Sequence, residues 1–237
     1  MHVIRQRGSA PHRPDGGRLA SRRITIDSRE FNGGRFEMSD GLRWTLQAYP
    51  EGFSVSFTKG LDAARLIDRI GPRNASTLLL SREQAEAIDL FNHHPDETDL
   101  ESVELDEEEC RNLGFIDRNV HILRIGEIEG WAFALQSFDT YAASRRIAEL
   151  ASATTRHIAF SCTSNADVWV QYSVDGAVVD SFDPLYPPRT SEGGLNIRGL
   201  EGAADPIASV LTHLESTEGL SIPREADFTS LPSIAVI

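Results

Sequence analysis

The chain has 237 residues, of which 40% are hydrophobic and 25% are charged, as in most folded globular proteins. Its formal net charge of −13 argues against duplex DNA or RNA as the main partner, because phosphate binding requires a basic surface. No apolar run reaches the ~18 residues of a membrane span, and two isolated cysteines imply no disulfide framework, so we expect a cytoplasmic protein.

Arginine is concentrated at the N-terminus. Residues 1–23 hold six arginines, one aspartate and no apolar periodicity, which predicts a disordered basic arm. The remaining residues, 24–237, are predicted to form a single globular domain. Nucleic acid is an unlikely partner except through this arm. Lys59 is the only lysine among the 23 basic residues of the whole chain, a bias that codon usage in a GC-rich genome explains.

The first half is predicted to contain strand, strand, helix, strand and helix, over residues 42–48, 53–58, 63–70, 77–80 and 81–91. The first helix places Leu61, Ala64, Ile67 and Ile70 on one face. The second begins with a capping-box pattern, in which Ser81 is followed three residues later by Gln84.

An acidic run follows over residues 96–109, where nine of the fourteen side chains are carboxylates and none is basic. Like charges repel one another, so we predict a solvated loop that a basic partner could contact. Calcium is an alternative ligand, but the alternating carboxylate pattern and the turn glycine of a calcium loop are absent. Asp106, Glu107 and Glu108 are the candidate contact residues in this run.

The second half is predicted to contain five strands, over residues 120–124, 130–136, 155–162, 167–173 and 177–182. Two helices are predicted over residues 140–151 and 206–214, and an irregular tail from residue 221 onward. Asp175-Gly176 favours a tight hairpin between the last two strands. We therefore expect an α+β fold, in which a mixed, mainly antiparallel sheet packs with three to four helices. Residues 24–95 and 115–237 could be two similar halves joined by the acidic loop.

Catalytic motifs are not recognisable. The chain has no nucleophile elbow, phosphate-binding glycine loop or dinucleotide fingerprint. We therefore predict no cofactor, and the sequence favours a protein that is not an enzyme. His93 and His94 are adjacent but lack the spacing of a second metal ligand, so no metal site is predicted. Ser161-Cys162 has no neighbouring base in the sequence.

The segment 181–189 combines Asp183, Tyr186 and Arg189 with three prolines. Prolines hold a segment extended and reduce the entropy that it loses on binding, so this loop is a possible contact surface. The alternative is a rigid crossover in which Phe182 and Tyr186 fill the core. Trp131 and Trp169 are the aromatic residues that could line a pocket beside this loop.

Three stretches carry a resemblance to a known family. They are Phe53–Asp62 (FSVSFTKGLD), Gly130-Trp131-Ala132, and the run from Trp169 through Asp175-Gly176 to Ser181–Pro187 (SFDPLYP). Together they resemble an actinobacterial family of unknown function over about residues 42–215. The resemblance implies the fold and no activity. Gln136 stands where members of that family often have a glutamate.

The sequence thus favours a binding or regulatory module, of an immunity, defence or assembly-accessory type, whose acidic surface contacts a basic protein partner. The alternative is an enzyme or small-ligand sensor with a pocket near Trp131, Trp169 and the Asp183–Arg189 loop.

Overall fold

The computed structural model describes residues 35–36, 41–187, 194–195, 197, 200 and 202–237. The predicted basic arm over residues 1–23 lies outside these ranges, and so does Arg189.

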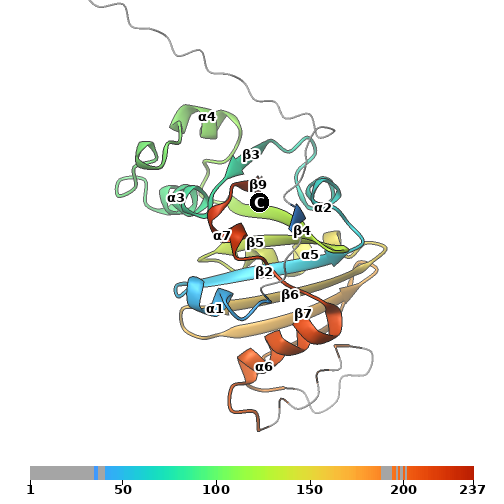
Figure 1. Cartoon of the computed structure of the whole chain (residues 1–237). Helices are drawn as coiled ribbons and strands as arrows, with labels where there is room; N and C mark the ends of the chain where they lie inside the picture. Colours follow the sequence, from blue (N-terminus) through green and yellow to red (C-terminus); the bar gives the residue numbers. More distant parts are fainter. Residues whose placement is uncertain (1–34, 37–40, 188–193, 196, 198–199, 201) are drawn as a thin grey trace, which may run out of the picture.

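A nine-stranded sheet forms the centre of the fold, in the order β3-β9-β4-β5-β2-β6-β7-β8, and β1 lies beside β4 (Figure 1). The strands are β1 (Arg35–Phe36), β2 (Gly52–Lys59), β3 (Thr77–Leu80), β4 (His121–Ile128), β5 (Trp131–Ser137), β6 (Arg156–Thr163), β7 (Val168–Val174), β8 (Ala177–Phe182) and β9 (Leu231–Val236). The β1–β4 pair is parallel and the other pairs are antiparallel, which confirms the predicted α+β class.

The helices are α1 (Thr45–Ala48), α2 (Ala63–Ile70), α3 (Arg82–His93), α4 (Glu107–Asn112), α5 (Arg145–Ala151), α6 (Pro206–His213) and α7 (Glu225–Phe228). Local capping chemistry explains where several of them begin. The predicted capping box is present, because Ser81 Oγ accepts from the Gln84 amide while the Gln84 side chain accepts from the Ser81 amide. Within the described residues, none of these helices has the length and apolar character needed to cross a bilayer.

The segment 42–48, predicted as a strand, instead contains the short helix α1. Its apolar residues alternate as in a strand, but contacts with distant residues decide its conformation. Glu215 accepts hydrogen bonds from the Leu42 and Arg43 amides, and the Trp44 indole donates to the Ile222 carbonyl at 2.7 Å.

The tail from residue 221, predicted as irregular, is also a correction. It contains α7 and then β9, which pairs with β3 on one side and with β4 on the other. Pro232 lies at the start of β9, and the pairing with β4 begins one residue later, at Ser233. A proline without an amide hydrogen is tolerated at such a position. The predicted helix over 140–151 is divided, because Ser144 ends a 3₁₀ helix (Tyr141–Ala143) and caps α5.

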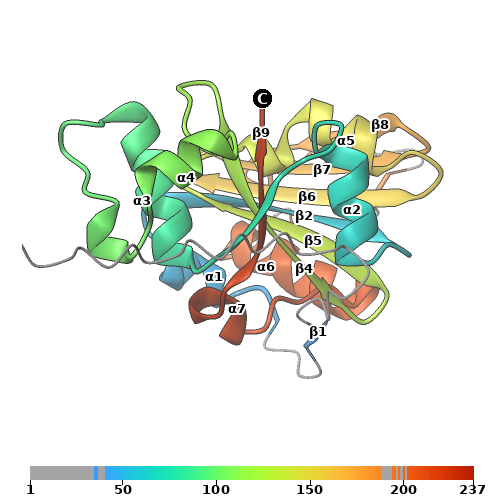
Figure 2. The same cartoon turned by 90° about the horizontal axis from the view of Figure 1, so that it is seen from above.

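Side chains alternate between two faces of the sheet. On one face, the apolar side chains of β2, β5 and β6, such as Phe57, Phe133 and Ile158, pack with α6 and α7. On the other face, small residues such as Ala132 and Ala134 lie against α2 and α5. Both views place α3 and α4 at one end of the strands and α2 at the other (Figures 1 and 2).

Strands from the two sequence halves belong to the same sheet. β2 comes from the first half but lies between β5 and β6 of the second half. The segments predicted as two similar halves therefore do not form separate sheets in the described residues.

Candidate functional site

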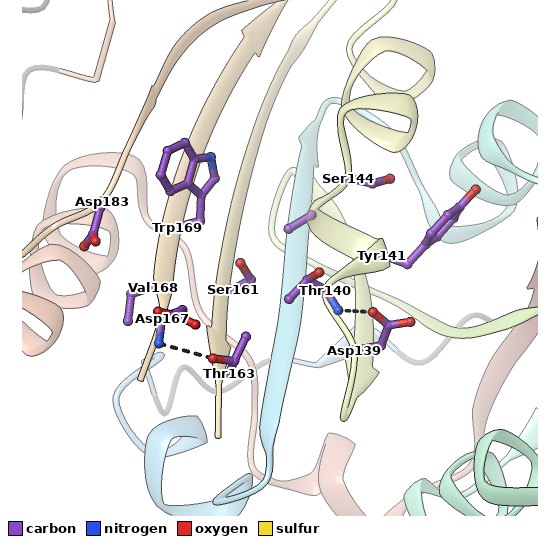
Figure 3. Close-up of a pocket in the computed structure, with 11 residues that line it drawn as sticks. Asp139, Thr140, Tyr141, Ser144, Ser161, Thr163, Asp167, Val168, Trp169 and Asp183 are labelled. Carbon is purple, nitrogen blue, oxygen red and sulfur yellow. Dashed lines mark hydrogen bonds between the residues drawn. The ribbon is translucent and has the colours of Figure 1, made fainter. Parts of the chain in front are cut away.

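A groove of about 490 Å³ opens on the α5-covered face of the sheet. Its walls are the segment 139–144, the facing ends of β6 and β7, and Asp183, which follows β8. Figure 3 shows Trp169 between Asp183 on one side and Ser161 on the other. We call this feature the Trp169 groove.

The position of Trp169 follows from strand alternation. Its neighbours Val168 and Val170 are buried in the core on the opposite face, so the indole must point to the groove side. The indole Nε1 donates to Ser181 Oγ on the paired strand β8, at 2.5 Å. Trp169 remains 46% exposed, whereas Trp44 and Trp131 are 7% and 3% exposed. The indole is thus held by one hydrogen bond with much of its surface uncovered.

Two turns place carboxylates beside this indole. In the β6–β7 turn, the Asp167 amide donates to Thr163 Oγ1 at 3.2 Å (Figure 3), and the Thr163 amide donates to the Asp167 carbonyl at 3.0 Å. After β8, Asp183 Oδ1 accepts from the Leu185 amide at 2.8 Å. Neither carboxylate forms an ion pair with a side chain of the described residues.

Asp139 is differently engaged at the opposite wall. One of its oxygens accepts from the Thr140 amide, and the other lies 2.6 Å from His121 Nδ1. The His121 ring stacks on Tyr141 with 4.0 Å between centroids and 10° between planes. Asp89 lies near this pair, and burial, together with the charge of Asp139, raises the pKa of its carboxyl.

The groove offers an aromatic surface, carboxylates and hydroxyls. Among the residues that the structure describes, no lysine, arginine, histidine or cysteine lines it. Ser144 Oγ accepts from the Ile147 amide as the cap of α5, and Cys162 packs against the core on the other face. This set of groups suits binding better than acyl transfer, which needs an activated nucleophile. Within the described residues, no three histidine, cysteine or acidic side chains gather as a metal site.

A second hollow, of about 590 Å³, is formed by the acidic run. We call residues 96–109 the acidic segment. It is folded, which corrects the predicted solvated loop: a 3₁₀ helix spans Glu101–Val103, and α4 begins at Glu107. Asp106 caps α4, because its Oδ1 accepts from the Glu109 amide at 2.8 Å.

Buried anchors hold the acidic segment in place. Leu100 and Cys110 are 3% and 2% exposed and pack with Phe115 in one apolar cluster. Gln84 of α3 donates to the Val103 carbonyl at 3.0 Å. All nine carboxylate residues of the segment are exposed. Within the described chain, only Glu107 among them forms an ion pair, and its partner is Arg111.

The structure brings together only some of the residues singled out from the sequence. Trp169 and Asp183 line the same groove, whereas Trp131 is buried on the opposite face of the sheet. Phe182 fills the core as one reading of its loop predicted, but Tyr186 is 80% exposed and does not.

Other groove residues were missed. Thr140 is the first residue of the predicted helix over 140–151, Asp167 is the first residue of a predicted strand, and Asp139 belongs to no predicted element. No local pattern marks them, because the sheet register and the 3₁₀ helix bring them together. Gln136, where the resembling family often has glutamate, is buried, and its side-chain oxygen accepts from the Ala142 amide at 3.1 Å.

Comparison with known proteins gives a family and no further relative. No curated protein and no solved structure matches the chain. The model of a family of unknown function, DUF6461, matches residues 40–211, which cover well over half of the chain and include β2 to β8 and both sides of the Trp169 groove. The chain therefore belongs to this family of unknown function.

Proposed function

We propose that this protein is a binding module that acts by contact with a positively charged protein partner, and that the acidic segment is the contact surface. One observation carries the proposal: nine exposed carboxylates lie on a folded, anchored segment whose ion pairing within the described residues is limited to Glu107–Arg111. Their charge is available to a partner.

Rigid placement of these charges favours binding. A disordered acidic tail loses conformational entropy when it binds, whereas a folded segment has already lost it. Leu100 within the segment and Cys110 directly after it are buried in the core, and the Asp106 cap fixes the start of α4. Complementary charge also speeds encounter, and salt weakens this effect.

Two further attributes belong to the same proposal. A cytoplasmic location is supported by the two free cysteines, Cys110 and Cys162, because disulfides are rare in a reducing compartment. An actinobacterial source is supported by the arginine bias, with Lys59 as the only lysine in the chain.

The test compares two variants of equal net charge. The first neutralises the acidic segment by Glu101→Gln, Glu104→Gln, Glu107→Gln and Glu108→Gln. The control neutralises four exposed carboxylates elsewhere by Glu51→Gln, Asp68→Asn, Glu129→Gln and Asp175→Asn. Each protein and the wild type serves as bait in a lysate of the native host, and every captured protein is identified and then purified for binding measurements.

We expect the wild type and the control to capture the same basic protein, and the first variant to bind it at least about tenfold more weakly in low salt. The advantage of the wild type should shrink as salt rises from about 50 to 500 mM, because screening weakens exposed charges. Equal affinity of the first variant and the control at every salt concentration would contradict the proposal.

A small-ligand sensor is the second candidate, and the Trp169 groove is the observation that favours it. Residues 1–23, the predicted route to nucleic acid, lie outside the described structure.

A further inference from the structure

We propose that the Trp169 groove is a second binding site, specific for a guanidinium group. It shares no lining residue with the hollow of the acidic segment, so this inference does not depend on the function proposed above. Three features of the groove carry it: a fixed and exposed indole, negative charge that no cation of the described residues balances, and a set of lining groups that accept hydrogen bonds.

The indole is presented as a platform. The backbone of Trp169 is held in β7 between β6 and β8, and the hydrogen bond from Nε1 to Ser181 Oγ restricts the orientation of the ring. Figure 3 shows the ring on β7, two residues along the chain from Asp167. Folding buries the other two tryptophans of this chain almost completely, so the exposure of Trp169 is not typical of how the protein places its indoles.

The charge of the groove is negative and unbalanced. Asp139 has a partner in His121, but Asp167 and Asp183 have no cationic side chain within the described part of the chain. The hydrogen bond that Asp183 receives from the Leu185 amide uses one carboxylate oxygen and leaves the other for a ligand. A neutral ligand would leave the carboxylates of Asp167 and Asp183 to repel each other, whereas a cation bound between them would offset that repulsion.

Guanidinium fits this combination better than ammonium. Its plane stacks on an aromatic face, and its fork of N–H donors pairs with a carboxylate through two parallel hydrogen bonds. The Ser161 and Thr163 hydroxyls on the groove wall can accept further donors. Cation–π attraction is strongest over tryptophan.

Two sources can supply the group, a free small guanidine or an arginine side chain of a polypeptide. The first probe is N-acetyl-arginine amide, and its neutral isostere N-acetyl-citrulline amide is the matched control. The second probe is the tripeptide acetyl-Gly-Arg-Gly amide. Binding to the full-length protein is measured by the shift of the tryptophan indole N–H signal in NMR titrations.

We expect the arginine amide to shift one indole signal, that of Trp169, and citrulline amide to bind at least about tenfold more weakly, because it keeps the shape but loses the charge. Tighter binding of the tripeptide than of the amino-acid amide would assign the group to a polypeptide. Equal affinity would assign it to a small molecule, and either result supports a guanidinium site.

Variants test the residues. Asp167→Asn with Asp183→Asn should weaken arginine amide binding at least about tenfold, and Trp169→Phe should weaken it less than Trp169→Ala, since phenylalanine keeps part of the platform. Both Trp169 variants lack the indole N–H group that reports binding, so their binding is followed by calorimetry. Asp68→Asn and Tyr186→Ala, which alter an exposed acid and an exposed aromatic outside the groove, should leave affinity unchanged.

Four results would overturn the proposal. The first three are equal binding of the arginine and citrulline amides, unchanged binding by the folded Trp169→Ala or double-asparagine variant, and no detectable binding of arginine amide at concentrations up to about 50 mM. Binding of a neutral disaccharide such as maltose in preference to arginine amide would also contradict it.

Discussion

At the residue scale, His157 is the clearest example of a polar side chain that the fold forces into the interior. It lies on β6, has no exposed surface, and faces α5 with Ser173 of β7 beside it. Its Nδ1 lies 3.0 Å from Thr58 Oγ1, whereas its Nε2 has no partner among the described residues. Burial lowers the pKa of this imidazole to about 3.

This pKa predicts a loss of stability in acid. In the unfolded chain, His157 takes up a proton as the pH falls through about 6.5, but the folded state does not until about pH 3. The stabilising contribution of His157 is therefore complete above about pH 6.5, and this contribution should fall by about 1.4 kcal/mol for each pH unit as the pH decreases from 6.5 toward 3. Denaturant unfolding across this range measures it.

The variant His157→Gln isolates this effect, because glutamine has no proton to gain. The slope of its free energy of unfolding against pH should be smaller than that of the wild type, because the variant takes up about one proton fewer on unfolding. His93→Gln, which removes an exposed imidazole, is the control for the substitution itself. If His157→Gln kept the same slope as the wild type, the buried neutral state of His157 would be refuted.

At the scale of single elements, α4 shows how a highly acidic stretch can fold. Four successive acids, Asp106 to Glu109, would repel one another in a loop, but at the beginning of a helix they face unpaired amide groups and the positive end of the helix dipole. The buried Cys110 then fixes the turn to the core. Acidic composition alone predicted a solvated loop; the carboxylates are exposed as predicted, but these local interactions decide for a helix.

We expect Asp106→Ala to destabilise α4 by about 1 kcal/mol, because the Glu109 amide loses its acceptor. Hydrogen exchange at Glu109 and Cys110 should become faster, while exchange in α3 stays unchanged. Glu108→Ala serves as the control, since it removes a charge from the same turn without removing a cap. Equal protection of α4 in both variants would contradict the role of Asp106.

At the scale of the whole molecule, the C-terminal strand holds the sheet together. β9 lies between β3 and β4 and brings Ile234 into the cluster under α2. Arg124 of β4 adds a second link, because its buried guanidinium donates to the Leu80, Ala226 and Thr229 carbonyls, which joins the end of β3 to α7.

A substitution in β9 should therefore destabilise the entire fold. We expect Ile234→Ala to reduce the free energy of unfolding by about 2–5 kcal/mol, the usual range for a buried isoleucine. Ile237→Ala, which changes a residue that is 67% exposed just past the strand, should alter it by less than about 0.5 kcal/mol. Thermal unfolding distinguishes them, and a similar effect of the two would show that β9 is peripheral.

The sequence by itself determined the elements whose causes are local. The capping box at Ser81 and the Asp175-Gly176 hairpin are set by residues a few positions apart, so their patterns are readable. The bounds of α2 were also predicted, but of the expected stripe only Ile70 is fully buried, and the other buried residues of this helix are Ala63 and Leu66. The acidic charge of the chain could be read directly from its composition.

Only the tertiary structure decided what depends on distant residues. Leu42–Ala48 alternates like a strand, but Glu215 and Ile222 hold it as a helical turn. β9 forms in a tail that contains Pro232, because β3 and β4 offer it pairing on both sides. The Trp169 groove likewise joins residues 139–144 to Asp167 and Asp183. A local pattern records the conformation that a segment prefers, whereas packing free energy from partners far along the chain decides which segments meet.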